Sequence, residues 1–218
     1  MKKITEKQLR HIISECIKTS LNELQAWHGS RANFNKFDSK FIGSGTGLST
    51  FGWGVYVTTS QETGQAYAQE VEANGERYLY TVDIPDDNGR NYINIQGNNP
   101  NVYNYIQQAL TKAKPDAASD IQWCLDYCRE NDSLTWLFQN RCEFFFTPEE
   151  LSKALLNAGI VGVRVPVTFE GQNGAVGVGN NGYNYTIFDA NQVRIIQKQR
   201  YGNNTQQQYR AVSENVHK

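Results

Sequence analysis

A histidine at the end of an apolar stretch is one residue of this sequence that could do chemistry. His28 is followed by Gly29 and Ser30, and it comes after the apolar residues Leu24 and Trp27. This pattern predicts a strand that ends near the histidine, and a histidine placed there can point one ring nitrogen into a cleft. The same triplet often has a purely structural role, so it becomes informative only together with other residues.

Two tyrosines at a fixed distance supply those other residues. Tyr56 follows Gly52-Trp53-Gly54 on an expected strand, and Tyr67 stands eleven positions later on an expected helix. The two glycines permit a close backbone approach where a β-carbon would collide. Two tyrosines so placed could hold a flat aromatic ring between them, with stacking worth about 0.5–1.5 kcal/mol each. The alternative is an aromatic core cluster, since the chain contains 12 Tyr and 10 Phe.

The elements that must position these residues predict an α+β fold. Short apolar stretches broken by glycine predict strands within residues 26–30, 51–58, 76–84, 91–95, 160–167 and 183–189. Helical patterns lie near 61–72, 100–113, 117–130 and 148–158. Thr147 is the expected N-cap of the last helix and Gly159 its expected C-cap. Because strands and helices do not alternate as in a doubly wound fold, we expect one α+β domain.

Three segments differ from this domain. Residues 4–24 predict an amphipathic helix that either packs on its own domain or docks a larger partner. Residues 168–182 are rich in glycine and predict a mobile loop over a site. The tail, residues 202–218, is polar and is expected to be disordered. We therefore divide the chain into an N-terminal helix (1–24), a domain (25–201) and a tail (202–218).

Composition narrows the class of protein. The chain has 21 Lys+Arg and 22 Asp+Glu among 218 residues, a net charge of -1, which argues against nucleic acid as an obligate partner. The cysteines lack metal-knuckle spacing, so we expect no metal, and we expect Cys124 and Cys128 to be buried on one helix face. The first residues contain no apolar run long enough for a signal peptide or membrane span. This predicts a cytoplasmic protein, or one delivered into a target cell by another route.

Taken together, the motifs resemble one enzyme family. His28-Gly29-Ser30, the glycine-rich element that ends at Tyr56, and Tyr67 are similar in order and spacing to the NAD-binding half of ADP-ribosyltransferases. The resemblance is to the diphtheria-toxin and poly(ADP-ribose) polymerase type, whose signature is His, Tyr and Glu. It covers roughly residues 24–200 and is strongest to compact bacterial and phage-encoded domains. It implies a split antiparallel β-sheet core with an NAD cleft and flanking helices.

The resemblance also implies roles for individual residues. His28 would hydrogen-bond the adenosine ribose hydroxyl, and the backbone of Gly29 would receive the nicotinamide amide. Tyr56 and Tyr67 would hold the nicotinamide ring between them, and Ser30 would add a hydroxyl contact. NAD is then a co-substrate, and breaking its bond between nicotinamide and ribose passes through an oxocarbenium-like state.

The sequence departs from the family at the third signature residue. Asn184 stands where relatives of the polymerase type carry a catalytic Glu. An asparagine can hydrogen-bond a ribose hydroxyl but carries no negative charge, which argues against chain-building polymerase activity. A carboxylate supplied from elsewhere is the alternative, and Glu170 in the glycine-rich loop is better placed for this than Glu143.

These residues lead to one expected activity and two alternatives. We expect a mono-ADP-ribosyltransferase that transfers ADP-ribose from NAD to a macromolecular acceptor, a protein side chain, and releases nicotinamide. A bacterial or phage effector of toxin-like kind is the setting that the resemblance implies. One alternative is an NAD glycohydrolase, in which water replaces the acceptor. The other is a catalytically weak NAD-binding or interaction module, because Asn184 replaces the Glu.

Overall fold

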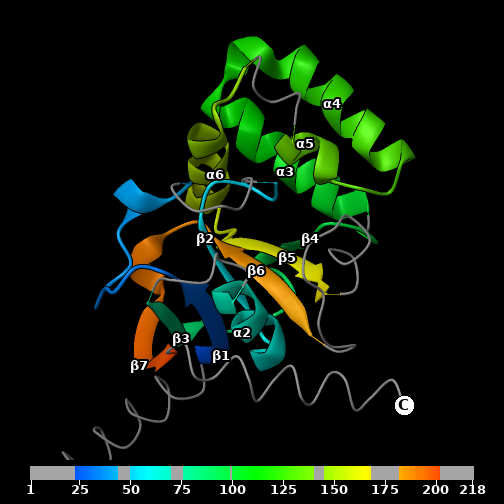
Figure 1. The fold of residues 1–218 in the computed structure, drawn as a ribbon. Coiled ribbons are helices and arrows are strands. Elements are labelled where there is room, and N and C mark those ends of the chain that lie inside the picture. Colours follow the sequence, from blue (N-terminus) through cyan, green and yellow to red (C-terminus); the bar gives the residue numbers. More distant parts are fainter. Residues whose placement is uncertain are drawn as a thin grey trace, which may run out of the picture.

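The computed structural model describes residues 23–43, 50–69, 76–98, 100–139, 145–167 and 182–201. These residues form an α+β fold with a mostly antiparallel open sheet and five α-helices (Figure 1). The strands are β1 (Glu23–Ser30), β2 (Val55–Thr58), β3 (Arg77–Pro85), β4 (Tyr92–Asn94), β5 (Gly162–Pro166), β6 (Tyr183–Ile187) and β7 (Arg194–Tyr201). The helices are α2 (Gln61–Gln69), α3 (Pro100–Ala113), α4 (Ala118–Glu130), α5 (Thr135–Gln139) and α6 (Pro148–Asn157).

The seven strands form one sheet in the order β4-β5-β6-β2-β1-β3-β7. Only β4 and β5 run parallel, and every other neighbouring pair is antiparallel. The expected α+β class is thereby confirmed, as are the six predicted strands, although β2 is shorter than its predicted range. The seventh strand, β7, was not predicted as a separate strand. It is an edge strand whose described side chains are mostly exposed, so it lacks the apolar alternation of a buried strand.

The sheet is strongly curled. β3 and β4 are five strand steps apart in the sheet, which would be about 24 Å if the sheet were flat. However, the Tyr92 hydroxyl donates a hydrogen bond of 2.7 Å to the carbonyl oxygen of Pro85, at the end of β3. The two halves of the sheet must therefore face each other, and a first apolar core fills the space between them. Its buried members include Ala26, Val55, Val57, Tyr78, Tyr80, Val82, Ile84, Tyr92, Tyr185 and Ile187.

An ion pair also stabilises the curled form of the sheet. Arg164 on β5 bonds the carboxylate of Asp87, in the connection between β3 and β4, and the side chain of Asn94 on β4. The Tyr185 hydroxyl lies 3.4 Å from the same carboxylate. Burial, together with the negative charge of Asp87, raises the pKa of Tyr185 to about 12. The tyrosine therefore stays neutral at physiological pH and can donate to the carboxylate.

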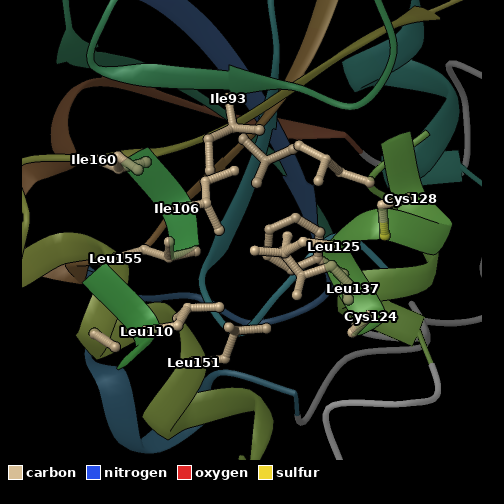
Figure 2. Close-up of a cluster of buried hydrophobic side chains, with 14 of the residues drawn as sticks. Ile93, Ile106, Leu110, Cys124, Leu125, Cys128, Leu137, Leu151, Leu155 and Ile160 are labelled. Carbon is tan, nitrogen blue, oxygen red and sulfur yellow. The ribbon is translucent and has the colours of Figure 1, made fainter. Parts of the chain in front are cut away.

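A helical layer covers the other face of β4, β5 and β6 and forms the second core. α3, α4, α5 and α6 lie together at the top of Figure 1. Their apolar side chains meet Ile93 on β4 and Val163 and Val165 on β5 in one buried cluster, part of which is drawn in Figure 2. Cys124 and Cys128 are buried in this cluster and form no disulfide, as predicted for them. A hydrogen bond between the two thiols and burial raise the pKa of Cys128, which keeps it protonated.

The residues at its two ends explain where α6 begins and ends. The Thr147 hydroxyl accepts a hydrogen bond from the backbone N–H of Glu150, whose carboxylate accepts one from the N–H of Thr147. This capping box starts α6, which confirms the predicted N-cap. At the other end the predicted C-cap is one residue too late: Ala158 is the C-cap, and Gly159 follows it with φ = 90°, a left-handed conformation that favours glycine.

One sequence prediction changes at the start of the domain. β1 begins at Glu23, so the helix predicted over residues 4–24 does not reach its predicted end, because Glu23 and Leu24 pair with Pro85 and Ile84 of β3. The rest of that helix, like the polar tail, lies outside the described residues. Among the helices that the structure describes, none is both long and apolar enough to cross a membrane.

Candidate functional site

The strands that carry His28 and Tyr56, β1 and β2, are paired at one position and diverge after it. β1 pairs with β3 along its whole length, from Glu23 to Ser30. Its pairing with β2 consists of the single pair Trp27 and Thr58. The resemblance implied a split sheet, and the described strands instead form one sheet that narrows to this pair. The three residues after Trp27, His28 to Ser30, therefore lie where β1 and β2 diverge.

The imidazole of His28 occupies the point of divergence. Its Nδ1 lies 2.7 Å from the backbone carbonyl oxygen of Tyr56 on β2. A carbonyl oxygen can only accept a hydrogen bond, so Nδ1 carries the proton. Burial lowers the pKa of His28 below its usual value, although the bond to Tyr56 acts in the opposite direction. The neutral ring therefore presents Nε2 as a hydrogen-bond acceptor at pH 7.

An aromatic group that sequence reasoning missed holds this ring. Phe37 meets the imidazole edge-to-face at a centroid distance of 5.1 Å, and Phe34 and Tyr80 lie 6.2 Å from it. Phe34 stacks on Tyr80 at 4.2 Å. The Tyr80 hydroxyl accepts from the N–H of Phe34 and donates to the carbonyl oxygen of Ala32. Tyr80 thereby fixes the loop after β1. The repeated Phe in the sequence around Phe34 and Phe37 was the available signal.

Gly29 lies directly against α2. A β-carbon at Gly29 would lie 2.5 Å from the carbonyl oxygen of Gly64 and 2.9 Å from the carbonyl carbon of Tyr67, and also against the backbone nitrogen of Ala68. Gly64 is equally close to the strand, since a β-carbon there would lie 2.7 Å from the β-carbon of Trp27. Glycine on both sides thus lets the helix backbone touch the strand backbone. The contact brings Tyr67 beside Gly29.

Tyr56 is fixed by the glycine-rich turn that precedes it. Its hydroxyl accepts from the N–H of Phe51 and donates to the carbonyl oxygen of Gly52, both at 3.0 Å. Gly52 has φ = 106°, which favours glycine. A β-carbon at Gly54 would lie 2.5 Å from the carbonyl oxygen of Ile187, so the close backbone approach predicted for these glycines is observed there. Because the Tyr56 hydroxyl is engaged in the turn, a ligand would meet the ring and not the hydroxyl.

Asn184 lies on the same face of the sheet as Tyr56. In β6 it stands opposite Thr58 of β2 and Val165 of β5, while Thr186 stands opposite Tyr56. Residues directly opposite each other in an antiparallel pair share a face. We call Tyr56, Thr58, Asn184 and Thr186 the polar strip. Three of its members, Thr58, Asn184 and Thr186, are buried.

The polar strip lies between two packed regions on the same face of the sheet. On one side, α2 packs over β1, as the contacts of Gly29 and Gly64 show. On the other side, the helical layer packs over Val163 and Val165 of β5. Gly29 and Trp27 share the face of the strip, whereas His28, next to both in the strand, starts from the opposite face. Its bond to Tyr56 carries the imidazole into the gap between the strands.

The remaining predicted site residues have other positions. The Ser30 hydroxyl accepts from the N–H of Ala32, so it shapes the turn after β1. Glu170 and Glu143, the two candidate carboxylates, lie outside the described residues, as does most of the loop predicted over residues 168–182. Within the described part of the chain, no group of three or more His, Cys, Asp or Glu side chains could hold a metal ion.

Comparisons with protein-family models, with curated proteins and with solved structures gave no match to this chain.

Proposed function

We propose that this protein binds NAD at the divergence of β1 and β2 and transfers its ADP-ribose to an acceptor, with release of nicotinamide. The proposal includes the ADP-ribosyltransferase fold, which the curled sheet and the divergence at Trp27 support. The observation that carries it is the hydrogen bond from His28 Nδ1 to the Tyr56 carbonyl oxygen. This bond leaves Nε2 as an acceptor beside a backbone edge that β2 does not cover, at the residues where the family resemblance implies NAD contacts.

Each contact in the proposal has a physical reason. Nε2 of neutral His28 accepts a hydrogen bond from a hydroxyl of the adenosine ribose. The backbone of Gly29 receives the nicotinamide amide, which no side chain at this position obstructs. Tyr67, beside Gly29, and Tyr56 hold the nicotinamide ring from two sides, with Ser30 as an additional hydroxyl. Stacking on each face contributes about 0.5–1.5 kcal/mol.

In the proposed reaction, no side chain of the protein forms a covalent bond to the substrate. Nicotinamide leaves with the electron pair of its bond to the anomeric carbon, and positive charge develops on the ribose. The acceptor then attacks this carbon and loses a proton to solvent. Asn184, in the buried polar strip with Thr58 and Thr186, positions a ribose hydroxyl through its amide. Because Asn184 carries no charge, the proposal assigns the stabilising carboxylate to another residue, with Glu170 as the first candidate.

One observation favours a second function. The polar strip of Tyr56, Thr58, Asn184 and Thr186 contains no carboxylate, and electrostatic stabilisation of the developing charge is usually the largest contribution to catalysis. A module that binds NAD and turns it over slowly or not at all is therefore the alternative. An NAD glycohydrolase uses the same site with water as the acceptor.

Nicotinamide release and label transfer distinguish these functions. Purified protein is incubated with NAD labelled in its adenylate phosphate, with and without a bacterial lysate, and three signals are measured: released nicotinamide, labelled protein, and non-covalent binding of labelled NAD to the purified protein. The transferase gives labelled bands in the lysate that His28→Ala abolishes. Nicotinamide release that needs no acceptor indicates the glycohydrolase. NAD binding without release indicates the binding module, and absence of all three signals contradicts the proposed site.

A further inference from the structure

One lysine on the edge strand β7 holds the loop that follows β1. The Lys198 ammonium donates to the side-chain oxygens of Asn33 at 2.6 Å and Asn35 at 2.9 Å. It also donates to the carbonyl oxygen of Phe34 at 3.3 Å. An ammonium group has three donors, so these three loop oxygens engage all of them. Figure 1 draws this loop in blue, next to β7.

A tyrosine on the neighbouring strand holds the same segment. Tyr80 of β3 stands directly opposite Lys198 of β7, so the two side chains share a face of the sheet. The Tyr80 hydroxyl accepts from the N–H of Phe34 and donates to the carbonyl oxygen of Ala32. Each residue from 32 to 35 is therefore bonded to one or both of these side chains. We call Tyr80 and Lys198 the loop clamp.

The clamped loop carries the phenylalanines that line the candidate site. The ring of Phe34 lies 6.2 Å from the imidazole of His28, and the ring of Phe37 lies 5.1 Å from it. Between residues 31 and 36 every side chain except that of Phe34 is exposed, so the loop has few apolar contacts to keep it in place. Its hydrogen bonds to the loop clamp supply the remaining order. Without those of Lys198, the phenylalanines would move away from the imidazole and water would reach it.

We propose that Lys198 is a positioning residue of the candidate site. Through the loop clamp it keeps the aromatic wall against His28, and with it the orientation in which Nε2 accepts a hydrogen bond. A side chain held by packing and by supporting hydrogen bonds presents its polar atom to a ligand in one geometry. The role of Lys198 in NAD binding rests on the proposed function. Its effect on the surroundings of His28 can be measured without NAD.

Proton NMR titration of the His28 ring in the full chain, without NAD, tests the effect on the imidazole. The chain has three histidines, and the signal that His28→Gln removes is that of His28. Burial holds the pKa of His28 below its usual value. Lys198→Met keeps a long side chain but donates no hydrogen bond, so water should reach the ring. The pKa of His28 is then expected to rise by about 0.5 or more, toward its usual value of about 6.5.

Two further variants separate the loop clamp from the charge of Lys198. Arg200→Met removes a positive charge from the same face of β7, where Arg200 pairs with Glu76 and not with the loop. It should leave the pKa of the imidazole unchanged. The double variant Asn33→Ala, Asn35→Ala keeps the charge of the lysine and removes two of its three acceptors. It should raise this pKa as Lys198→Met does.

Three results of this titration would overturn the proposal. An unchanged pKa of His28 in Lys198→Met would show that the loop keeps its place without the lysine. An equal rise in Arg200→Met would assign the effect to charge alone. Should Lys198→Met fail to fold, the double asparagine variant decides, and an unchanged pKa in that variant would count against the loop clamp.

Titration calorimetry with NAD then tests the positioning role. Lys198→Met should bind NAD about fivefold more weakly than the wild type, the effect of about one weakened hydrogen bond, whereas Arg200→Met should bind it equally well. Equal affinity of Lys198→Met and the wild type, despite a raised pKa of His28, would show that Lys198 does not position the imidazole for NAD. A wild type that binds no NAD would contradict the proposed function, and the NMR titration would still decide whether Lys198 holds the loop against His28.

Discussion

Adding one methyl group at Gly29 is a sharp perturbation of the candidate site. The β-carbon of Gly29→Ala would lie 2.5 Å from the Gly64 carbonyl oxygen, whereas ordinary contacts of a β-carbon begin near 3.4 Å. All its nearest neighbours are backbone atoms of α2, which no side-chain rotation can remove. The helix must therefore move by about 1 Å, and overpacking of this kind costs about 1–3 kcal/mol of stability.

The same movement displaces Tyr67, because its carbonyl carbon is one of the atoms that the new β-carbon meets. A misplacement of about 1 Å in a reactive geometry can lower a rate about 100-fold. We therefore expect Gly29→Ala to fold with reduced stability and to release nicotinamide from NAD about 100-fold more slowly. Urea denaturation measures the stability, and chromatography of nicotinamide measures the rate.

Gly89→Ala is the matched control. It places a β-carbon in open space at φ = 76°, so backbone strain alone lowers its stability by about 1–2 kcal/mol. Its nicotinamide release should stay at the wild-type rate despite the lower stability. The reasoning is refuted if Gly29→Ala is folded and keeps the wild-type rate, because Tyr67 would then not be positioned through Gly29.

Three further predictions address the histidine, the third signature residue and the curl of the sheet. Because burial lowers the pKa of His28, the unfolded chain takes up this proton first as the pH falls below about 6.5. The free energy of unfolding of the wild type, relative to that of His28→Gln, should therefore fall as the pH is lowered from about 6.5 to the pKa of His28 in the folded protein. The affinity for NAD should fall once Nε2 is protonated. Urea denaturation measures the first effect and titration calorimetry the second, both over about pH 5–7.5. Asn184→Ala removes one hydrogen bond and should raise the activation free energy of nicotinamide release by about 0.5–1.5 kcal/mol. Asn184→Glu should retain or raise the rate of release. If Glu170→Gln abolishes turnover and adding Asn184→Glu restores it, Glu170 is the missing carboxylate. If neither change alters turnover, the active site lies elsewhere. Tyr92→Phe leaves the Pro85 carbonyl oxygen without this donor and should cost about 1–3 kcal/mol in urea denaturation while NAD affinity is unchanged; an unchanged midpoint would contradict the role of this bond.

The fold class could be predicted because it rests on local patterns. Apolar stretches broken by glycine gave six strands, and Thr147 and Gly159 marked the ends of α6. β7 was missed because an edge strand with exposed side chains has no apolar face to detect. The helix predicted to residue 24 was too long because the pairing of Glu23 with Pro85 depends on residues far away in the sequence.

The candidate site could be predicted only as a set of residue types. Spacing identified His28, Tyr56 and Tyr67, but it could not show that the Tyr56 hydroxyl is engaged in the turn at Gly52. It also gave no sign that Tyr80, 52 positions after His28, helps to hold the imidazole. Such contacts arise from the curl of the sheet, which no local pattern encodes.

NAD binding by the purified protein tests the central claim most directly. Isothermal titration with NAD should give saturable binding of one molecule for each chain, and His28→Ala should abolish or strongly weaken it without loss of the folded state by circular dichroism. Exposed Phe41→Ala serves as the control and should bind NAD as the wild type does. If the wild type shows no heat of binding up to millimolar NAD, or if His28→Ala binds equally well, the divergence of β1 and β2 is not an NAD site.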